Sequence, residues 1–294
     1  MLEASVRTGG LMTALGVIAA ALAAFPARAD DTMTLPCAMP AAVALGDRPG
    51  TGRSVSAGGS PCVAPLGEVV MESGVRTQQT TAAHGTDTLT SWPLTFLRTG
   101  IARRWELGIA TPLREVRAIT GAPNFDNAAG WTDMAVVAKY QVLDTASTQI
   151  SVAAGLTAPT GTGEFTNGLP TYGAGVNAGI AITPRLSFAT SLNAGTAIGP
   201  DARGANHPYF VFAPSFTLAY AVDSVDTLLL QSAITSRQAP IAPAGNRALI
   251  GVLRALGERL SIDAEYEHNV APLPGLRQNA LGFGFVWILA PPRR

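Results

Sequence analysis

Polar and apolar residues alternate with a period of two through most of the chain from about residue 66 onward. In Glu68 to Gln78 the charged side chains share one face with Gln78, and in Leu260 to His268 three carboxylates share one face. A helical period would mix the two classes, so the alternation predicts strands, and we count about twelve runs of roughly ten residues. The other runs lie near residues 94–100, 105–112, 134–143, 149–156, 172–182, 186–194, 209–220, 227–237, 249–256 and 281–288.

The connections between these runs alternate strictly between short and long. The short ones are 101–104, 144–148, 183–185, 222–226 and 257–259, and the long ones are 79–91, 111–131, 158–171, 198–208, 238–246 and 270–278. Bacterial outer-membrane barrels join their strands by tight periplasmic turns and longer outer loops. The pattern therefore predicts an all-β chain that forms a closed antiparallel transmembrane β-barrel of about 12 strands over residues 66–294, in the bacterial outer membrane.

Aromatic residues gather at the predicted strand ends, as they do in the two interfacial girdles of membrane barrels. An alternative is that strand ends favour aromatic residues for local packing alone. The predicted girdle residues next to short turns or the C-terminus are Trp105, Tyr140, Tyr220 and Trp287, and those next to long loops are Trp92, Trp131 and Tyr172.

The charged face of each strand then lines the lumen. The predicted lumen-lining residues are Glu68, Glu72, Arg76, Arg98, Glu106, Lys139, Arg237, Arg254, Asp263, Glu265 and Glu267. A hairpin register centred near Ala102 sets Arg98 opposite Glu106 and predicts an ion pair. Two interpretations remain open for the lumenal charges: ion pairs that nearly close the bore, or facing acidic and basic rows that orient polar or zwitterionic solutes.

Composition agrees with a membrane barrel and argues against a nucleic-acid partner. Charged residues make up 14% of the 294 residues, against about 25% in an average soluble domain. The chain contains a single Lys, Lys139, and no basic cluster that could contact phosphates.

The first 29 residues have the pattern of a secretory signal peptide. Arg7 precedes an apolar run over residues 11–25, and Ala27-Arg28-Ala29 forms a small-residue cleavage site. The alternative, an N-terminal membrane helix, needs about 20 apolar residues, more than this run provides.

Residues 30–65 are rich in Pro, Gly, Ala and Ser and show no strand alternation, so they predict a non-barrel segment. It is either a periplasmic extension or a plug in the lumen. Both cysteines, Cys37 and Cys62, fall within it, and export to an oxidising compartment predicts a disulfide between them. A zinc site would need further ligands at metal spacing.

Several stretches resemble a known family. LRTGIARRWELGIATP, GWTDMAVVAKYQVLD and GLTAPTGTGEF are similar to the bacterial outer-membrane transporter family associated with the meta-pathway of phenol degradation, over about residues 46–288. The resemblance implies an outer-membrane barrel that takes up small organic compounds, aromatic ones among the candidates. The chain departs from a common barrel ending, because ILAPPRR follows Trp287.

No catalytic or metal motif is evident in the sequence. His84, His207 and His268 are not in HxSNG-like motifs, and GxSxG is absent. Asp263, Glu265 and Glu267 are spaced too regularly to single out an acid–base pair, and the loop oxygens of Asn124, Asp126 and Asn127 are too few for an EF-hand.

We therefore predict a non-enzymatic, cofactor-free channel for passive uptake of small organic solutes. Loop 111–131 is long enough to fold inward as a constriction. The expected partners are outer-membrane lipid, the solute and the barrel-assembly machinery. The alternatives are a non-conducting structural or assembly-associated barrel and, third, an outer-membrane hydrolase.

Overall fold

The computed structural model describes residues 60–82, 85–93, 95–121, 127–201, 203–237, 244–270 and 276–290. The predicted signal peptide, Cys37, His84, Asn124 and Asp126 lie outside the described residues, so the predictions that rest on them stay predictions.

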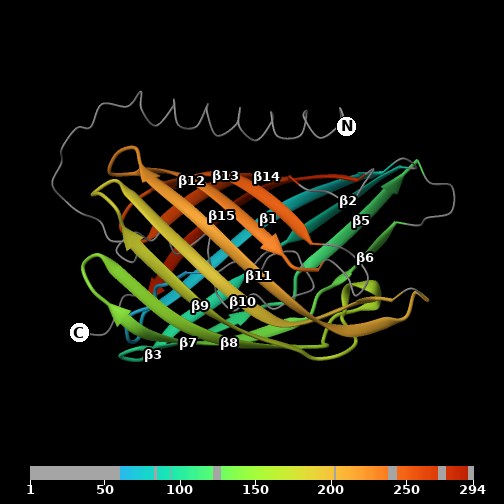
Figure 1. The fold of residues 1–294 in the computed structure, drawn as a ribbon, viewed down its shortest axis with the longest axis horizontal. Coiled ribbons are helices and arrows are strands. Elements are labelled where there is room, and N and C mark those ends of the chain that lie inside the picture. Colours follow the sequence, from blue (N-terminus) through green and yellow to red (C-terminus); the bar gives the residue numbers. More distant parts are fainter. Residues whose placement is uncertain are drawn as a thin grey trace, which may run out of the picture. The chain divides into compact units, whose positions relative to one another are not determined.

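Fifteen strands form one antiparallel sheet that closes on itself through pairing of its last strand, β15, with its first, β1 (Figure 1). The elements are β1 (Val69–Ala82), β2 (Gly85–Trp92), β3 (Phe96–Ala102), β4 (Trp105–Ala110), β5 (Arg114–Thr120), β6 (Ala128–Trp131), β7 (Met134–Asp144), β8 (Thr148–Ala158), η1 (Gly163–Phe165), β9 (Thr171–Ala181), β10 (Leu186–Pro200), β11 (Asn206–Ala221), β12 (Asp226–Thr235), β13 (Gly245–Ala255), β14 (Leu260–Asn269) and β15 (Arg277–Ala290).

These fifteen segments make twelve barrel strands, because three strands are each interrupted once. β2 and β3 are two parts of one barrel strand, because the start of β1 pairs with β3 and its end pairs with β2. β4 and β5 are likewise two parts of one strand, because β4 pairs with β3 and β5 pairs with β2. The halves β6 and β7 continue the same pattern. The prediction of a closed antiparallel barrel of about 12 strands is confirmed.

The three interruptions fall beside one another at Pro93, at Pro112 and at residues 132–133. Proline cannot donate to a strand ladder, which explains two of the breaks. Backbone bonds bridge the gaps, since Thr111 N–H donates to the carbonyl of Thr95 at 3.0 Å and Thr132 N–H donates to that of Leu113 at 2.9 Å. The wall is therefore bent at these points without being opened.

The predictions that 79–91 and 111–131 are loops were wrong for most of their residues. β2, β5, β6 and the end of β1 extend the wall there (Figure 1). The end of β1 and most of β2 carry polar, mainly Thr, side chains on both faces. A strand that leaves the membrane has no need of an apolar face, so its alternation is hard to see in the sequence.

Side chains in the membrane-spanning wall alternate sharply between the two faces. On β9, Val176 and Ile180 are 44% and 45% exposed, whereas Asn177 between them is fully buried. Apolar side chains on the outer surface and polar ones inside are the arrangement of a membrane barrel. Two small apolar clusters also lie among the buried residues, one around Leu253 and Val286 and one around Phe96.

Within the described ranges, no helix is long and apolar enough to cross a membrane.

Candidate functional site

The barrel interior contains a network of ion pairs on β1, β3, β4 and β7. Arg98 Nε lies 2.8 Å from Glu72 Oε1, and Arg98 Nη1 lies 2.9 Å from Glu106 Oε2. Lys139 Nζ lies 3.7 Å from Glu106 Oε1. All four side chains are at most 4% exposed, so these charges compensate one another in a water-poor setting.

The Arg98–Glu106 pair forms, but in a different register from the one predicted. Arg98 lies opposite Gly108 and Glu106 opposite Gly100, with an irregularity before Ala102. The two side chains therefore meet diagonally. The bulge between Gly100 and Ala102 explains the shift, because an extra residue in a hairpin displaces the pairing.

A second group of charges lies on β1, β13 and β14. Arg76 Nη2 lies 2.8 Å from Glu267 Oε1, and Arg247 Nη1 lies 3.5 Å from the same oxygen. Arg76 reaches Glu267 across β15, whose inward residues at this level, Ala280 and Gly282, are small. Asp263 and Glu265 share the inner face of β14 with Glu267.

The interior charges are confined to one side of the barrel. They lie on the neighbouring strands β13, β14, β15, β1, β3, β4 with its continuation β5, and β7, and we call this side the charged wall. Strands β8 to β11 contain no Asp, Glu, Lys or Arg. The charges are therefore not arranged as facing acidic and basic rows.

Two residues predicted to line the lumen lie elsewhere. Arg254 faces outward and pairs with Asp226 at 2.6 Å, because its neighbour Leu253 occupies the inner face in an apolar cluster. Arg237 is exposed beyond the end of β12. Glu68 is half-buried just before β1 and is close enough to Arg98 and Glu106 to interact with them electrostatically. The prediction for Arg254 was wrong because it assigned the charged residue to the inner face. On β13 the neighbouring Leu253 faces inward instead.

The segment Ser60–Pro65, which we call the strap, lies against the inner faces of β3, β4, β7, β8 and β9. Ala64 N–H donates to Glu106 Oε2 at 2.6 Å, and Lys139 Nζ donates to the carbonyl of Cys62 at 3.2 Å. Ser151 Oγ donates to the carbonyl of Ser60 at 3.4 Å. The strap thus crosses the interior close to the short turns.

Two glycines make room for the strap. A Cβ at Gly100 would meet the carbonyl oxygens of Ala64 and Pro65, and one at Gly179 would meet Pro61 at 2.8 Å. The strap was not located by sequence reasoning, because it has no strand alternation; the inward-facing glycines Gly100 on β3 and Gly179 on β9 were the available signal. Cys62 is buried in the strap, and its predicted disulfide partner lies outside the described residues.

The side of the interior formed by β8, β9 and β10, which we call the neutral wall, carries uncharged polar side chains. Its fully or almost fully buried members are Gln149, Ser151, Thr157, Thr171, Asn177, Ser191 and Asn193. The alternation places Ser191 and Asn193 on the polar face of residues 186–194, but none of the seven is among the predicted lumen-lining residues, which are all charged.

At the barrel end with the longer loops, residues 159–170 fold against the wall. Arg117 on β5 lies 2.8 Å from Glu164 and 3.2 Å from Asp87. Asp133 accepts bonds from the amides of Gly161 and Asn167, each at 2.8 Å. A Cβ at Gly130 would meet Phe165 of this loop. These contacts hold loop 159–170 to the wall. Residues 122–126 of the predicted constriction loop 111–131 lie outside the described residues, so that prediction stays a prediction.

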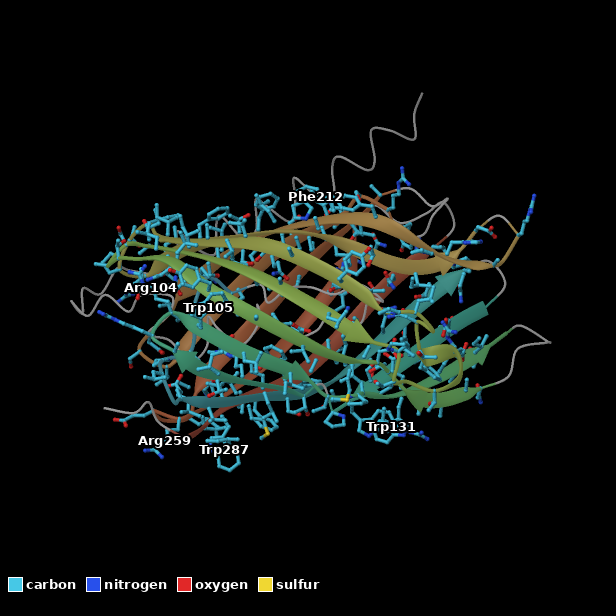
Figure 2. The ribbon with its side chains drawn as sticks, turned by 90° about the horizontal axis from the view of Figure 1, so that it is seen from below. Arg104, Trp105, Trp131, Phe212, Arg259 and Trp287 are labelled. Carbon is cyan, nitrogen blue, oxygen red and sulfur yellow. The ribbon has the colours of Figure 1, made fainter. Side chains whose placement is uncertain are left out.

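The predicted girdle residues lie on the outer face. Figure 2 shows Trp105 and Trp287 near one end of the barrel and Trp131 nearer the other, all pointing outward. Trp105 packs on Tyr140 with ring centroids 4.9 Å apart, and the Arg114 guanidinium lies 5.8 Å from the Trp131 ring. Trp92 and Tyr172 are exposed, and Tyr220 is half-exposed.

The histidines that the structure describes make contacts of an ordinary kind. His268 Nδ1 lies 2.7 Å from Asn279 Oδ1 on the outer face, and His207 Nε2 lies 3.3 Å from Asp201. In the described part of the chain, no group of three or more His, Cys, Asp or Glu side chains is placed to hold a metal ion.

Comparison with solved structures finds several outer-membrane channels and porins. The COG4313 outer membrane channel from Pseudomonas putida F1 has a TM-score of 0.61 at 13% identity, covering 77% of this chain and 97% of that one. The CymD monoaromatic hydrocarbon channel has a TM-score of 0.45 at 9% identity, covering 88% and 99%. The NanC porin has a TM-score of 0.49 at 13% identity, covering 74% and 100%.

The first of these shows that the fold is that of an outer-membrane β-barrel. Among curated proteins, no sequence matches this chain. A family model described as "Putative MetA-pathway of phenol degradation" matches residues 47–281, which include the strap and nearly all of the barrel. This chain therefore belongs to that family of outer-membrane β-barrels.

Proposed function

We propose that the protein is a passive outer-membrane channel for small organic solutes, aromatic compounds among them. The observation that carries this proposal is the inverted arrangement of the barrel, with polar side chains inside and apolar ones on the outer surface. The family description names phenol degradation, and uptake of small organic compounds would supply such a pathway. The protein then acts without catalysis or a cofactor.

The strap is the natural constriction of this channel. It crosses the interior near the short turns and is bonded to Glu106 and Lys139 of the charged wall. Export through the leader 1–29, a Cys37–Cys62 disulfide that stiffens the strap, and insertion by the barrel-assembly machinery belong to the same proposal. The girdle residues would hold the barrel at the two membrane interfaces.

The same contacts favour a second candidate function, a non-conducting structural barrel. Ion pairs and the strap both occupy the interior, and a barrel of this size is narrow enough for side chains to fill it. This candidate predicts a closed lumen in every functional state.

Conductance in a planar lipid bilayer separates the two candidates. The mature chain from residue 30 is compared with a variant that lacks residues 30–65, and a heat-modifiable band on a gel verifies that each barrel is folded. Discrete conductance steps in the intact chain, or steps that appear only after the deletion, support the channel. Silence of both folded proteins refutes it and favours the structural barrel.

A further inference from the structure

Three side-chain amides form a diagonal row on the neutral wall. Gln149 on β8 lies opposite Gly179, Asn177 on β9 lies opposite both Ser151 and Ser191, and Asn193 on β10 lies opposite Gly175. Each amide is therefore displaced by two residues, about 7 Å along the strand, from the one before it. We call Gln149, Asn177 and Asn193 the amide row.

The amide row is buried but incompletely bonded. Gln149 Oε1, Asn177 Oδ1 and Asn193 Oδ1 have no hydrogen-bond partner among the described residues, although the three side chains are at most 8% exposed. Buried polar groups in folded proteins almost always have a partner, and leaving one unmade is costly. Three such oxygens on adjacent strands indicate a surface prepared for a hydrogen-bonding occupant.

The strap covers one end of the row without satisfying it. A Cβ built at Gly179 would meet the ring of Pro61 and would lie 4.0 Å from Gln149 Oε1. Proline has no backbone N–H, so Pro61 cannot donate to this oxygen. At the other end, Asn193 Oδ1 lies in the space left by Gly175, where any side chain would displace it. The row thus runs from beneath the strap into the barrel.

We propose that the amide row is the solute subsite of the channel and that it takes small, uncharged molecules bearing hydroxyl groups. A hydroxyl both donates and accepts a hydrogen bond. It can therefore pair with an Asn or Gln side chain whether the amide oxygen or the amide nitrogen points toward it. The row lies on strands that contain no Asp, Glu, Lys or Arg, so a charged solute would find no counter-ion there.

The charged wall does not alter this preference. Its Arg98, Lys139 and Arg76 side chains are engaged by Glu72, Glu106 and Glu267. A solute carboxylate would have to replace an existing buried partner, whereas a hydroxyl meets oxygens that lack one. The uncharged molecule therefore gains bonds at the row that a charged or zwitterionic one of equal size does not.

This inference rests on the proposed function, so its test begins with a measurement that does not involve the solute. Conductance of the full mature chain in potassium chloride establishes the channel. Proteoliposome swelling then compares erythritol, an uncharged four-carbon polyol, with 4-aminobutanoate, a zwitterion of the same chain length. We expect the ratio of the erythritol rate to the 4-aminobutanoate rate to fall about fivefold or more in Asn177→Leu and Asn193→Leu.

The matched control is Gln231→Leu. It removes an amide from β12, which β11 separates from the amide row, and that amide already donates to Thr217 Oγ1 at 3.0 Å. Its swelling ratio should equal that of the unmodified chain. The variants Asn177→Ala and Asn193→Ala provide a second test, because they enlarge the bore. If the channel only selects by size, both the erythritol and the 4-aminobutanoate rates should rise. If the subsite is lost, the erythritol to 4-aminobutanoate ratio should fall.

An unchanged ratio in folded, conducting Asn177 and Asn193 variants overturns the subsite and leaves the channel standing. An equal fall in Gln231→Leu also overturns it, since the effect would then belong to any interior amide. Absence of conductance in the unmodified protein overturns the proposed function, and the subsite with it.

Discussion

Glu106 connects the charged wall to the strap, and its replacement by Gln tests that connection. Its Oε2 accepts from Ala64 N–H at 2.6 Å and from Arg98 at 2.9 Å, and its Oε1 lies 3.7 Å from Lys139 Nζ. Glu106→Gln preserves the size and shape of the side chain and removes only the charge. The Ala64 bond then changes from charge-assisted to neutral, the Arg98 bond keeps only the charge of its donor, and Lys139 loses a buried counter-ion.

The expected cost follows from the burial of this site. A hydrogen bond to a charged group contributes about 1.5–3 kcal/mol and a neutral one about 0.5–1.5 kcal/mol, so weakening the Ala64 bond costs about 1 kcal/mol. Breaking a buried ion pair by removing one partner costs about 3–5 kcal/mol. Because Arg98 retains Glu72, we expect a total near the lower end, about 3 kcal/mol.

The free energy of unfolding in urea, followed by heat-modifiable gel mobility of the barrel in detergent, measures this cost. Bilayer conductance of the same variant should rise, because the strap loses its charge-assisted bond at Ala64. Asp226→Asn is the matched control. It neutralises the carboxylate of the ion pair with Arg254, and the Arg254 side chain is 55% exposed on the outer face. An equal loss of stability in both variants, or no change in Glu106→Gln, would refute the reasoning.

Three further predictions concern the outer face, a loop and the strap. Val176→Arg places a charge on the exposed apolar surface of β9 and should lower barrel stability in lipid by about 2–4 kcal/mol, measured by urea unfolding in vesicles; an unchanged stability would show that this face does not meet lipid. Two backbone amides of the β10–β11 loop donate to Asp201 and hold its pKa below the usual value, so its contribution is present above the ordinary carboxyl pKa of about 3.9 and is lost as pH falls through the lowered value. The protection factors of those two amides against hydrogen exchange should fall in that acid range, and in Asp201→Asn they should no longer change there. Gly100→Ala drives a Cβ into the backbone of the strap, whereas at Gly282 a Cβ meets only the flexible Glu265 side chain; conductance should therefore change in Gly100→Ala and not in Gly282→Ala.

The fold could be predicted from the sequence where lipid imposes a pattern. Between the interfaces, one face of each strand must be apolar, and this constraint produces the alternation seen in stretches such as Leu260 to His268. The constraint ends where the wall leaves the membrane. The Thr-rich β2 and the strand β5 therefore look like loops in the sequence, and the breaks at Pro93 and Pro112 reinforce that impression.

The interior could be predicted only in part, for a related reason. Charge identifies an inward face when it stands among apolar residues, as at Glu106 and Lys139, but it misleads where an apolar cluster occupies the lumen, as beside Arg254. The amide row carries no charge, so alternation alone gives it no prominence. The path of the strap depends on contacts with strands far away in the sequence, which a local pattern cannot express.

The division of the interior into a charged wall and a neutral wall affects how such a channel can change during evolution. On the charged wall, Glu106 shares contacts with Arg98, Lys139 and the strap, so a change at one position alters the requirements at the others. Side chains of β8 to β10 can be exchanged one at a time without leaving a buried charge unpaired. Solute preference can therefore diversify on one half of the wall while the other half keeps the barrel intact.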